Sequence, residues 1–556
     1  MPHTVTGHIV DILARRIYDG AVTIADGRIA HIAPAPVAPD APYLMPGFID
    51  SHVHIESSMM VPAEFARVAV EQGTIGVVTD PHEIGNVLGV AGIDFMIDSG
   101  RNIRFNFCFG APSCVPSCGR DIESSGATID AAAISALMQR PDIGFLAEMM
   151  NYPGVLAGDA EVMAKIYAAL AAGKRVDGHA PGLTADERRR YAAAGISSDH
   201  ECSTLEEARQ CIASGMMLQI REGSAAKNYE QLMPILREHP DKVMFCTDDC
   251  HPGDLIRGHI NAIVKRALAD GYDLWDVLTA ACITPQRHYG LQWGMLRPGD
   301  AANFIAVDKI SPRMRVLSTV IRGKEVYNCN SYLSTIQSQA KSISNQMAIL
   351  GNYPNRFVAQ PITVADIALS LHQGDTAHII SAADGSLLTG HESVTVTGNP
   401  LADMRYPWGE VQKIVVYDRY HEGARPVVAL IRGFGITNGA MAASIAHDCH
   451  NIVAIGSDDD YIVRAINRVI EMQGGEVAIA GDELTDMALP IAGLISPLSG
   501  HEIAYRSERL QDTIHKAGCS LKSPFITMAF MCLPVIPELK LTDRGLMDTK
   551  AWRFIS

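Results

Sequence analysis

Two regions of the chain alternate apolar and polar residues, one near its start and one past its midpoint. The first, AVTIADGRIAHIA at residues 21–33, alternates around an Asp-Gly step, which is a strong short-range signal for a β-hairpin. The second comprises GDAANFIAVDK and VLSTVIRGKEVY, which turns at an Arg-Gly step. We therefore expect residues 1–45 and 295–328 to form one small β domain that is discontinuous in the sequence.

Between residues 46 and 294 the pattern changes to short apolar runs that alternate with helical stretches. The eight candidate strands are GFIDSHVH, IGVVTDPH, IRFNFCFG, IGFLAEMM, RVDGHAPG, ISSDHEC, MMLQIREG and KVMFCTDD. The helical stretches include PAEFARVAVEQG, DAEVMAKIYAALAAG and LEEARQCIASG, each with a glycine where a C-cap is expected. Eight such units over about 250 residues have the size of a TIM barrel. A doubly wound sheet shares the alternation, but polar residues at nearly every strand end favour closure. We predict an α/β fold with a TIM-type (β/α)8 barrel over residues 46–294.

The last third of the chain has strand and helix signals of its own. Candidate strands are KIVVYDRY, PVVALIRGFG, NIVAIG and GEVAIA, and DDYIVRAINRVIEMQG is a candidate helix. We predict a separate C-terminal α/β or α+β domain over residues 351–556.

Composition and charge narrow the class of protein. The chain has 556 residues and a net charge of −16, from 46 basic and 62 acidic residues. This balance argues against binding to nucleic acid or to an anionic membrane surface and suits a small neutral substrate. The N-terminus carries no signal-peptide pattern, no apolar run approaches membrane-spanning length, and the 12 cysteines form no CxxC pair. We therefore expect a cytoplasmic protein with reduced thiols.

Metal-ligand side chains recur at the ends of the predicted barrel strands. His52 and His54 lie two residues apart, so both project from one face of the first strand. Because the chain has 20 histidines, that pair alone is weak support. Later strand ends add Glu148, His179, His200, Asp248 and Asp249. Such ends converge on one face of a TIM barrel, and burying four imidazoles and two carboxylates there is costly unless a cation compensates them.

The spacing of these side chains suggests two metal ions. One would be bound by the His-x-His pair, Asp248 and a shared Glu148, and the other by His179, His200 and the same carboxylate. A water that bridges two neighbouring cations has a lowered pKa, so it supplies hydroxide at neutral pH. This mixture of ligands suits Mn²⁺, Fe²⁺ or Zn²⁺, and spacing does not choose among them.

Several blocks of the chain resemble the amidohydrolase superfamily and, within it, the bacterial adenine deaminases. These blocks are PGFIDSHVHIESSM, TDPHEIGNV, DGHAPGL, SSDHECST, REGSAAKN and TDDCHPGDL, with ASIAHDCHNIVAIG and LPIAGLISP further on. The resemblance extends from the N-terminal hairpin to about residue 500. It implies hydrolysis of adenine to hypoxanthine and ammonia by attack of a metal-bridging hydroxide on C6, at a centre of two Mn²⁺ or Fe²⁺ ions. A small-molecule purine base is thus the expected partner, and we expect a homodimer.

The resemblance also implies roles for individual residues. It makes the ligands His52, His54, Glu148, His179, His200 and Asp248. Glu148 occupies the bridging place that a carbamylated lysine fills in many relatives, and no lysine occurs in FLAEMM. Asp248 is preferred to Asp249 because the superfamily's eighth-strand aspartate usually follows a Thr or Ser, here Thr247.

Catalysis also needs proton transfer to a ring nitrogen and to the departing amine. Asp248 is the expected proton shuttle. His82 and Glu83 follow the second strand, and we expect one of them to protonate N1, with burial raising the pKa of Glu83. The alternative is that this pair only buttresses its loop through Pro81.

Four further residues are candidate substrate contacts. They are Glu56, Ser57, Arg221 and Asp249. For Glu56 and Ser57 the alternative is N-capping of the helix that begins near Pro62, and for Arg221 it is a surface salt bridge. His447 and His450, three residues apart on a predicted helix, are either a hydrogen-bonded pair or metal ligands.

Other classes of protein fit the chain less well. Zinc-dependent nucleobase deaminases use H-x-E and P-C-x-x-C. His54-Ile55-Glu56 matches the first half, but three residues separate Cys114 from Cys118 where that motif has two, so this class is excluded. A dihydroorotase-like or allantoinase-like hydrolase more often carries the bridging lysine. A non-catalytic assembly module usually loses ligands, and here all six are present.

Overall fold

The computed structural model describes residues 2–331, 353–397 and 411–555. The chain divides into two compact units. The barrel unit comprises Met1–Pro81, Asp94–Ser113 and Asp130–Ile349, and the C-terminal unit comprises His82–Ile93, Cys114–Ile129 and Leu350–Ser556. Two short segments that follow barrel strands, at residues 82–93 and 114–129, thus belong to the C-terminal unit, which the sequence pattern did not predict.

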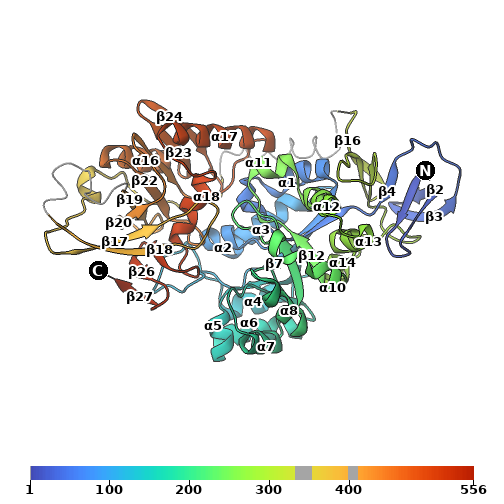
Figure 1. The fold of residues 1–556 in the computed structure, drawn as a ribbon, viewed down its shortest axis with the longest axis horizontal. Helices are drawn as coiled ribbons and strands as arrows, with labels where there is room; N and C mark the ends of the chain where they lie inside the picture. Colours follow the sequence, from blue (N-terminus) through green and yellow to red (C-terminus); the bar gives the residue numbers. More distant parts are fainter. Residues whose placement is uncertain (1, 332–352, 398–410, 556) are drawn as a thin grey trace. The chain divides into compact units, whose positions relative to one another are not determined.

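The barrel unit contains the predicted parallel strands (Figure 1). They are β5 (Phe48–His54), β6 (Thr74–Thr79), β7 (Asn106–Ala111), β8 (Ile143–Met149), β9 (Arg175–Gly178), β10 (Ser198–Asp199), β11 (Met217–Arg221), β12 (Val243–Cys246) and β13 (Asp248–Asp249). The last two are halves of one strand interrupted at Thr247, because β12 pairs with β11 and β13 pairs with β5. All these pairings are parallel and β9 lies beside β10, so the strands close into the TIM-type barrel that the pattern predicts.

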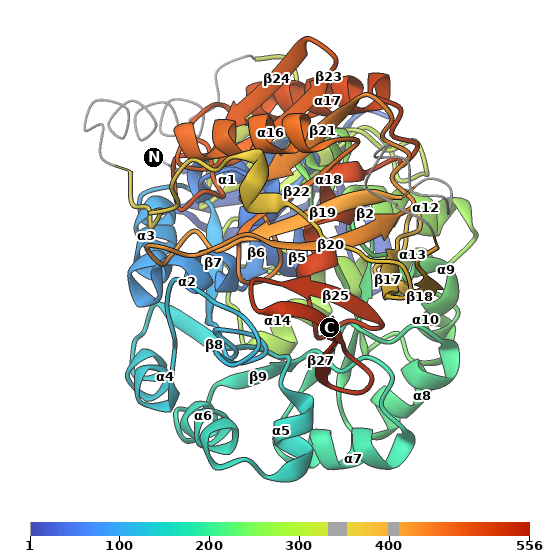
Figure 2. The same ribbon diagram turned by 90° about the vertical axis from the view of Figure 1, so that its left-hand side faces the viewer.

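Helices follow the barrel strands and cover their outer side, as α4, α6, α7 and α8 do in Figure 2. They are α1 (Pro62–Ala69), α3 (Val90–Arg101), α4 (Ala131–Met138), α5 (Tyr152–Ala157), α6 (Ala160–Ala171), α7 (Ala185–Ala193), α8 (Leu205–Ala213), α9 (Tyr229–Leu232), α10 (Ile235–Glu238), α11 (Pro252–Arg257), α12 (Ile260–Ala269), α13 (Leu274–Leu278) and α14 (Thr284–Tyr289). Local signals set several starts: Thr184 and Thr204 each form a capping box with the glutamate three residues on. No helix among the described residues has both the length and the apolar character needed to cross a membrane.

A second sheet of the barrel unit joins residues from both sides of the barrel in sequence. Its order is β16-β15-β14-β4-β1-β2-β3. The strands are β1 (His3–Asp11), β2 (Arg16–Ala25), β3 (Arg28–Pro34), β4 (Tyr43–Met45), β14 (Phe304–Val307), β15 (Val316–Ile321) and β16 (Lys324–Asn328). The predicted hairpin turn has positive φ at both Asp26 (51°) and Gly27 (75°), as its tight geometry requires.

The C-terminal unit has a mixed sheet of order β18-β17-β20-β19-β22-β21-β23-β24. Its strands are β17 (Thr376–Ser381), β18 (Gly390–Thr395), β19 (Gln412–Tyr417), β20 (Val427–Arg432), β21 (Gly439–Ala443), β22 (Ile452–Gly456), β23 (Gly475–Ala480) and β24 (Glu483–Ala488). Helices α16 (Asp459–Glu471) and α17 (Gly500–Lys516) pack on it (Figure 1), and α2 (His82–Leu88) and α18 (Pro524–Ala529) belong to the same unit. A small sheet of β25 (Leu539–Thr542), β26 (Gly545–Asp548) and β27 (Arg553–Ile555) ends the chain.

Candidate metal centre

The first barrel strand delivers two imidazoles to one place. Strand β5 is buried along its whole length, and His52 and His54 project from it with ring centroids 4.8 Å apart. The Nδ1 atom of His54 lies 3.0 Å from the backbone oxygen of Asp80. Because a carbonyl oxygen can only accept, Nδ1 carries the proton and the lone pair of Nε2 faces the other side chains.

Glu148, at the end of β8, lies at the centre of the cluster. Its side chain is only 3% exposed. Its Oε1 atom is 3.3 Å from His54 Nε2, and its Oε2 atom is 2.9 Å from His179 Nδ1 and 3.2 Å from His200 Nε2. His52 Nε2 is 3.9 Å from Oε2 as well. One carboxylate from β8 thus lies within 4 Å of imidazoles from three other strand ends.

Asp248 completes the cluster from the eighth strand. Its Oδ1 atom is 3.1 Å from His54 Nε2 and 3.5 Å from His52 Nε2. The neighbouring Asp249 instead accepts a hydrogen bond from Ser57 at 2.7 Å. The backbone at Asp248 has a positive φ of 56°, and the carboxylate of this residue faces the imidazoles. The structure therefore brings together all six side chains that were predicted as ligands.

Some nitrogens of this cluster lack hydrogen bonds. Both ring nitrogens of His52 and both of His200 are buried and have no hydrogen-bond partner among the described residues. Buried polar atoms are normally paired, and each unpaired one costs about 1–3 kcal/mol. Nitrogens that converge on carboxylate oxygens without hydrogen bonds fit coordination to a cation.

The shifts in the pKa values of these side chains also fit a site that binds positive charge. Burial lowers the pKa of His52, and His200 lowers it further. Burial opposes ionisation of Glu148, but the surrounding imidazoles, His179 first, outweigh it and hold the pKa of the carboxyl well below its ordinary value. Burial likewise lowers the pKa of His179, but Glu201 and Glu148 outweigh it and raise that pKa to about 9. The cluster therefore attracts positive charge, as bound protons or as a cation.

Glu201 belongs to the cluster but was not predicted from the sequence. Its Oε1 atom lies 3.4 Å from His200 Nε2 and 3.7 Å from His179 Nδ1, and it accepts a hydrogen bond from Arg221. Its position directly after His200, at the end of a barrel strand, was the available signal. The second partner of Arg221 is Asp248 Oδ2, at 2.5 Å. Since Arg221 is buried, the alternative of a surface salt bridge is wrong.

A buried network fixes the backbone just before Asp248. The carboxylate of Asp50 accepts hydrogen bonds from the backbone and side chain of Thr247, at 3.1 Å from the backbone nitrogen. His259 lies behind it, with Nε2 at 2.8 Å from Asp50 Oδ2 and Nδ1 at 2.7 Å from Thr74 Oγ1. Three elements thereby hold the break between β12 and β13 in place.

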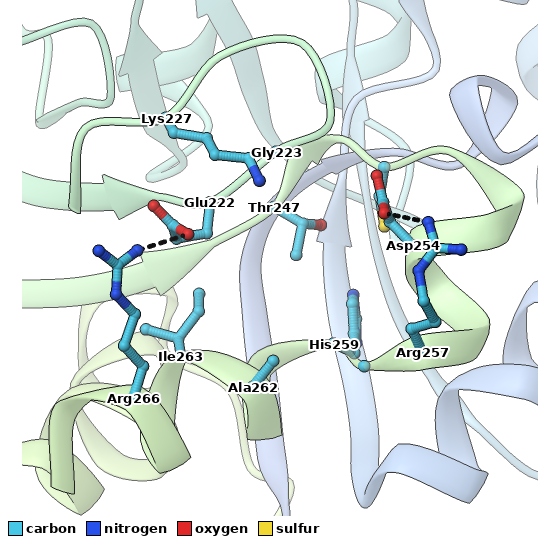
Figure 3. A pocket seen from close by; sticks show the side chains of 12 residues that line it. Glu222, Gly223, Lys227, Thr247, Asp254, Arg257, His259, Ala262, Ile263 and Arg266 are labelled. Atoms are coloured by element: carbon cyan, nitrogen blue, oxygen red, sulfur yellow. Dashed lines mark hydrogen bonds and ion pairs between the residues drawn. The ribbon is translucent and has the colours of Figure 1, made fainter. Parts of the chain in front are cut away.

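A cavity of about 250 Å³ lies beside this network. Figure 3 shows Thr247 and His259 on its wall, with the ion pairs Glu222–Arg266 (3.1 Å) and Asp254–Arg257 (2.8 Å) on either side. None of the six candidate ligands lines it. Its wall charges are largely paired with each other, so this cavity does not compete with the cluster as a catalytic site.

Glu56 and Ser57 lie in a short 3₁₀ turn, Ile55–Ser58, directly after β5. Glu56 is buried, and Ser57 donates its hydrogen bond to Asp249. Helix α1 has Val61 as its N-cap and no side-chain cap. The alternative that Glu56 or Ser57 caps this helix is therefore wrong.

His82 and Glu83 begin α2 in the C-terminal unit, three residues after β6 ends at Thr79 in the chain. Within that unit, Glu83 lies 2.8 Å from His447 Nδ1 and accepts a hydrogen bond from His450 Nε2. Burial opposes ionisation of Glu83, but the imidazoles, His447 first, outweigh it and hold its pKa well below the ordinary value. The expectation that burial raises this pKa is therefore wrong.

His447 and His450 do not lie on a helix. They occupy a turn between β21 and β22, where the sequence spacing suggested helical periodicity. Both histidines are hydrogen-bonded, as one of the two alternatives stated. However, they bond to Glu83 and not to each other.

Comparisons with known proteins cover the whole chain. The family model "Amidohydrolase family" matches residues 43–326, and the model "Adenine deaminase C-terminal domain" matches residues 386–553. An adenine deaminase of Salinibacter ruber is 46% identical over 99% of this chain and 98% of that protein. The adenine deaminase of Sulfurovum sp. is 44% identical over 98% of each chain, and that of Methanosarcina barkeri is 43% identical over 99% and 98%.

Proposed function

This chain belongs to the adenine deaminase family of the amidohydrolases, which makes it a metal-dependent hydrolase, and we propose that it converts adenine and water to hypoxanthine and ammonia. The observation that carries the proposal is similarity over nearly the full length of both proteins, together with the buried imidazole–carboxylate cluster. We also propose a role in purine salvage and a location in the cytoplasm.

We propose that the cluster would hold two divalent ions, with Glu148 as a ligand shared between them. The ligands would be His52, His54, Glu148, His179, His200 and Asp248. Mn²⁺ and Fe²⁺ are the expected metals, with Zn²⁺ as the alternative. Two such ions, when bound, supply an activated water at neutral pH and stabilise negative charge on it. The unpaired nitrogens of His52 and His200 support this assignment.

Asp248 is positioned to take the proton of the attacking water. Arg221 occupies its Oδ2 atom, so Oδ1 is the oxygen that faces the imidazoles. The water oxygen bonds to C6 of adenine, N1 takes a proton, and the C6–N6 bond breaks as the amine takes a second proton and leaves as ammonia. A carboxylate beside the nucleophile can carry the proton of the water to the departing amine.

Glu83 and His82 have different roles in this proposal. The low pKa of Glu83 keeps it ionised, so it accepts a hydrogen bond from the N–H of the five-membered purine ring and does not donate. His82, whose Nε2 atom is 3.4 Å from Glu83 Oε1, is then the donor to N1. Glu56, Ser57, Arg221 and Asp249 remain proposed substrate contacts, acting directly or by fixing the loop after β5.

The direct test is ammonia and hypoxanthine release from adenine by the purified protein, with metal content measured on the same sample. We expect two equivalents of a divalent transition metal and turnover of adenine. Guanine, dihydroorotate and allantoin serve as control substrates. Two bound ions with no ammonia from adenine would refute the proposed substrate, and turnover in metal-free protein would refute the metal centre. Sedimentation analysis tests the proposed homodimer independently.

A further inference from the structure

Two histidines from a distant part of the sequence, His447 and His450, contact the carboxylate of Glu83, one at each oxygen. His447 Nδ1 is 2.8 Å from Oε1, and His450 Nε2 bonds to Oε2. All three side chains are at most 7% exposed. Because the three residues belong to the C-terminal unit, this arrangement is a property of that unit alone.

The protonation of His450 is set by its own turn. The backbone N–H of Ala446 donates to His450 Nδ1 at 3.4 Å, so the single proton of the neutral ring lies on Nε2. Burial lowers the pKa of His450 to about 4, in spite of the neighbouring Glu83, so the ring is neutral near pH 7. His450 is therefore a neutral donor aimed at one carboxylate oxygen.

His447 is held by packing as well as by its hydrogen bond. Its ring stacks on Phe530 with centroids 4.3 Å apart and planes 23° apart, and its backbone N–H donates to the oxygen of Ala529 at 3.1 Å. A ring that is stacked on one face and carried by a hydrogen-bonded backbone has little freedom to turn its Nδ1 away from Glu83. Both donors are thus preorganised, which lowers the cost of keeping an ionised carboxylate buried.

We propose that His447 and His450 are positioning residues of the deamination site, which hold the carboxylate of Glu83 in the orientation that receives the purine. This inference rests on the proposed function of Glu83 in binding adenine. We prefer this role to the alternative of a metal site at the two histidines. Each histidine already directs one ring nitrogen to an oxygen of Glu83.

Matched amide substitutions test the inference sharply. The side-chain nitrogen of Asn can take the place of His Nδ1, and that of Gln can take the place of Nε2. We expect His447→Ala and His450→Ala to lower kcat/KM for adenine by roughly 10–100-fold with two metal ions still bound. His447→Asn and His450→Gln should recover most of this loss, and the swapped amides, His447→Gln and His450→Asn, should recover less.

The control is His421→Asn, because His421 pairs with Asp418 at 2.7 Å and its side chain is 56% exposed. It should match the wild type. Full activity in His450→Ala, or equal activity of matched and swapped amides, would overturn the inference. If an alanine variant does not fold, the four amide variants still decide between these outcomes.

A double-mutant cycle separates positioning from a merely structural role. In a Glu83→Gln background, His450→Ala should cause little further loss of kcat/KM, because the group that it positions is already altered. An undiminished loss in that background would contradict the inference. Failure of the proposed function is distinguishable, since it would show as no ammonia from adenine with the wild-type protein.

Discussion

The barrel unit and the C-terminal unit each bury a cluster of histidines and carboxylates, but they satisfy these side chains differently. Around Glu148, the ring nitrogens of His52 and His200 have no hydrogen bonds among the described residues. Around Glu83, His447 contacts one carboxylate oxygen and His450 donates a hydrogen bond to the other. The same two residue types therefore leave imidazole nitrogens without hydrogen bonds in one unit and form a hydrogen-bonded carboxylate in the other.

The difference follows from how many donors each carboxylate receives and where they originate. Glu148 has four imidazoles within 4 Å, and they come from three different strand ends. Glu83 has three imidazoles within 4 Å, and two of them, His447 and His450, lie in a single turn that also fixes their orientation. Residue type alone thus does not define a metal site; the count and direction of the lone pairs do.

The largest test of this comparison is Glu148→Gln, which keeps the shape of the side chain and removes its charge. We expect loss of most bound metal and at least about a 10³-fold fall in kcat, because a metal ion supplies several kcal/mol of stabilisation to the reaction. Elemental analysis and ammonia release measure the two effects. The matched control is Glu476→Gln, another fully buried glutamate in β23 of the C-terminal unit, which should keep its metal. A fully active Glu148→Gln protein would contradict the bridging role.

The next largest effect is expected for Arg221→Met, which removes the guanidinium group beside Asp248 but preserves much of the side-chain volume. We expect kcat to fall roughly 10–100-fold, since Asp248 and Glu201 both lose a charged hydrogen bond in a buried place. Steady-state kinetics and metal content are the measurements. Arg266→Met, at the half-exposed pair with Glu222, is the control and should behave as wild type. Unchanged kcat in Arg221→Met would show that Asp248 does not depend on this pairing.

A smaller effect is expected for His259→Phe, which disconnects Asp50 from Thr74 behind the cluster. Because the network acts on Asp248 only through Thr247, we expect about a tenfold loss of kcat with KM little changed. Lys227→Gln, on the opposite wall of the cavity in Figure 3, is the control for that region. If the two variants lose activity equally, the network does not position Asp248.

The smallest effect is on stability and concerns Glu123 in the C-terminal unit. Burial, with Asp448 adding to it, raises the pKa of Glu123 to about 8, while its oxygen accepts hydrogen bonds from Ser117 (2.8 Å) and the backbone of Cys118 (3.0 Å). The folded protein therefore holds a proton that the unfolded chain releases near pH 4.5. This contribution to stability is complete below about pH 4.5 and is lost as pH rises through about 8.

Glu123→Gln should remove that pH dependence. Relative to wild type, its Tm should rise by a few degrees between pH 5 and pH 9, as measured by thermal unfolding at both values. Glu483→Gln, at an exposed pair with Lys516, provides the control. A Tm difference that is the same at both pH values would mean that Glu123 is ionised in the folded protein.

Much of the barrel was predictable because its signals are local. Apolar runs, capping residues and terminal glycines mark each strand and helix, and chain order alone places their ends on one face. The six candidate ligands could therefore be named from the sequence, since each lies at the end of a recognisable strand. The hairpin at Asp26-Gly27 was predictable for a similar reason, because its turn geometry depends on two adjacent residues.

The partners of these residues were harder to predict because they depend on contacts between distant segments. The only sequence signal for Glu201 was its position directly after His200. Nothing in the sequence distinguished Arg221 from a surface residue, because its pairing with Asp248 depends on the fold. His447 and His450 have helical spacing, yet they occupy a turn. Such pairings arise from packing, and periodicity reports only local geometry.

By itself, the sequence determined which side chains lie at the C-terminal ends of the barrel strands, because strand periodicity and the order of the strands along the chain place these ends on one face of the barrel. Only the tertiary structure decided which of them lack hydrogen bonds, which aspartate faces the imidazoles, and that Glu83 is paired with histidines more than 360 positions later. The physical reason is that hydrogen-bond satisfaction and protonation depend on neighbours in space, whose distances no local pattern contains.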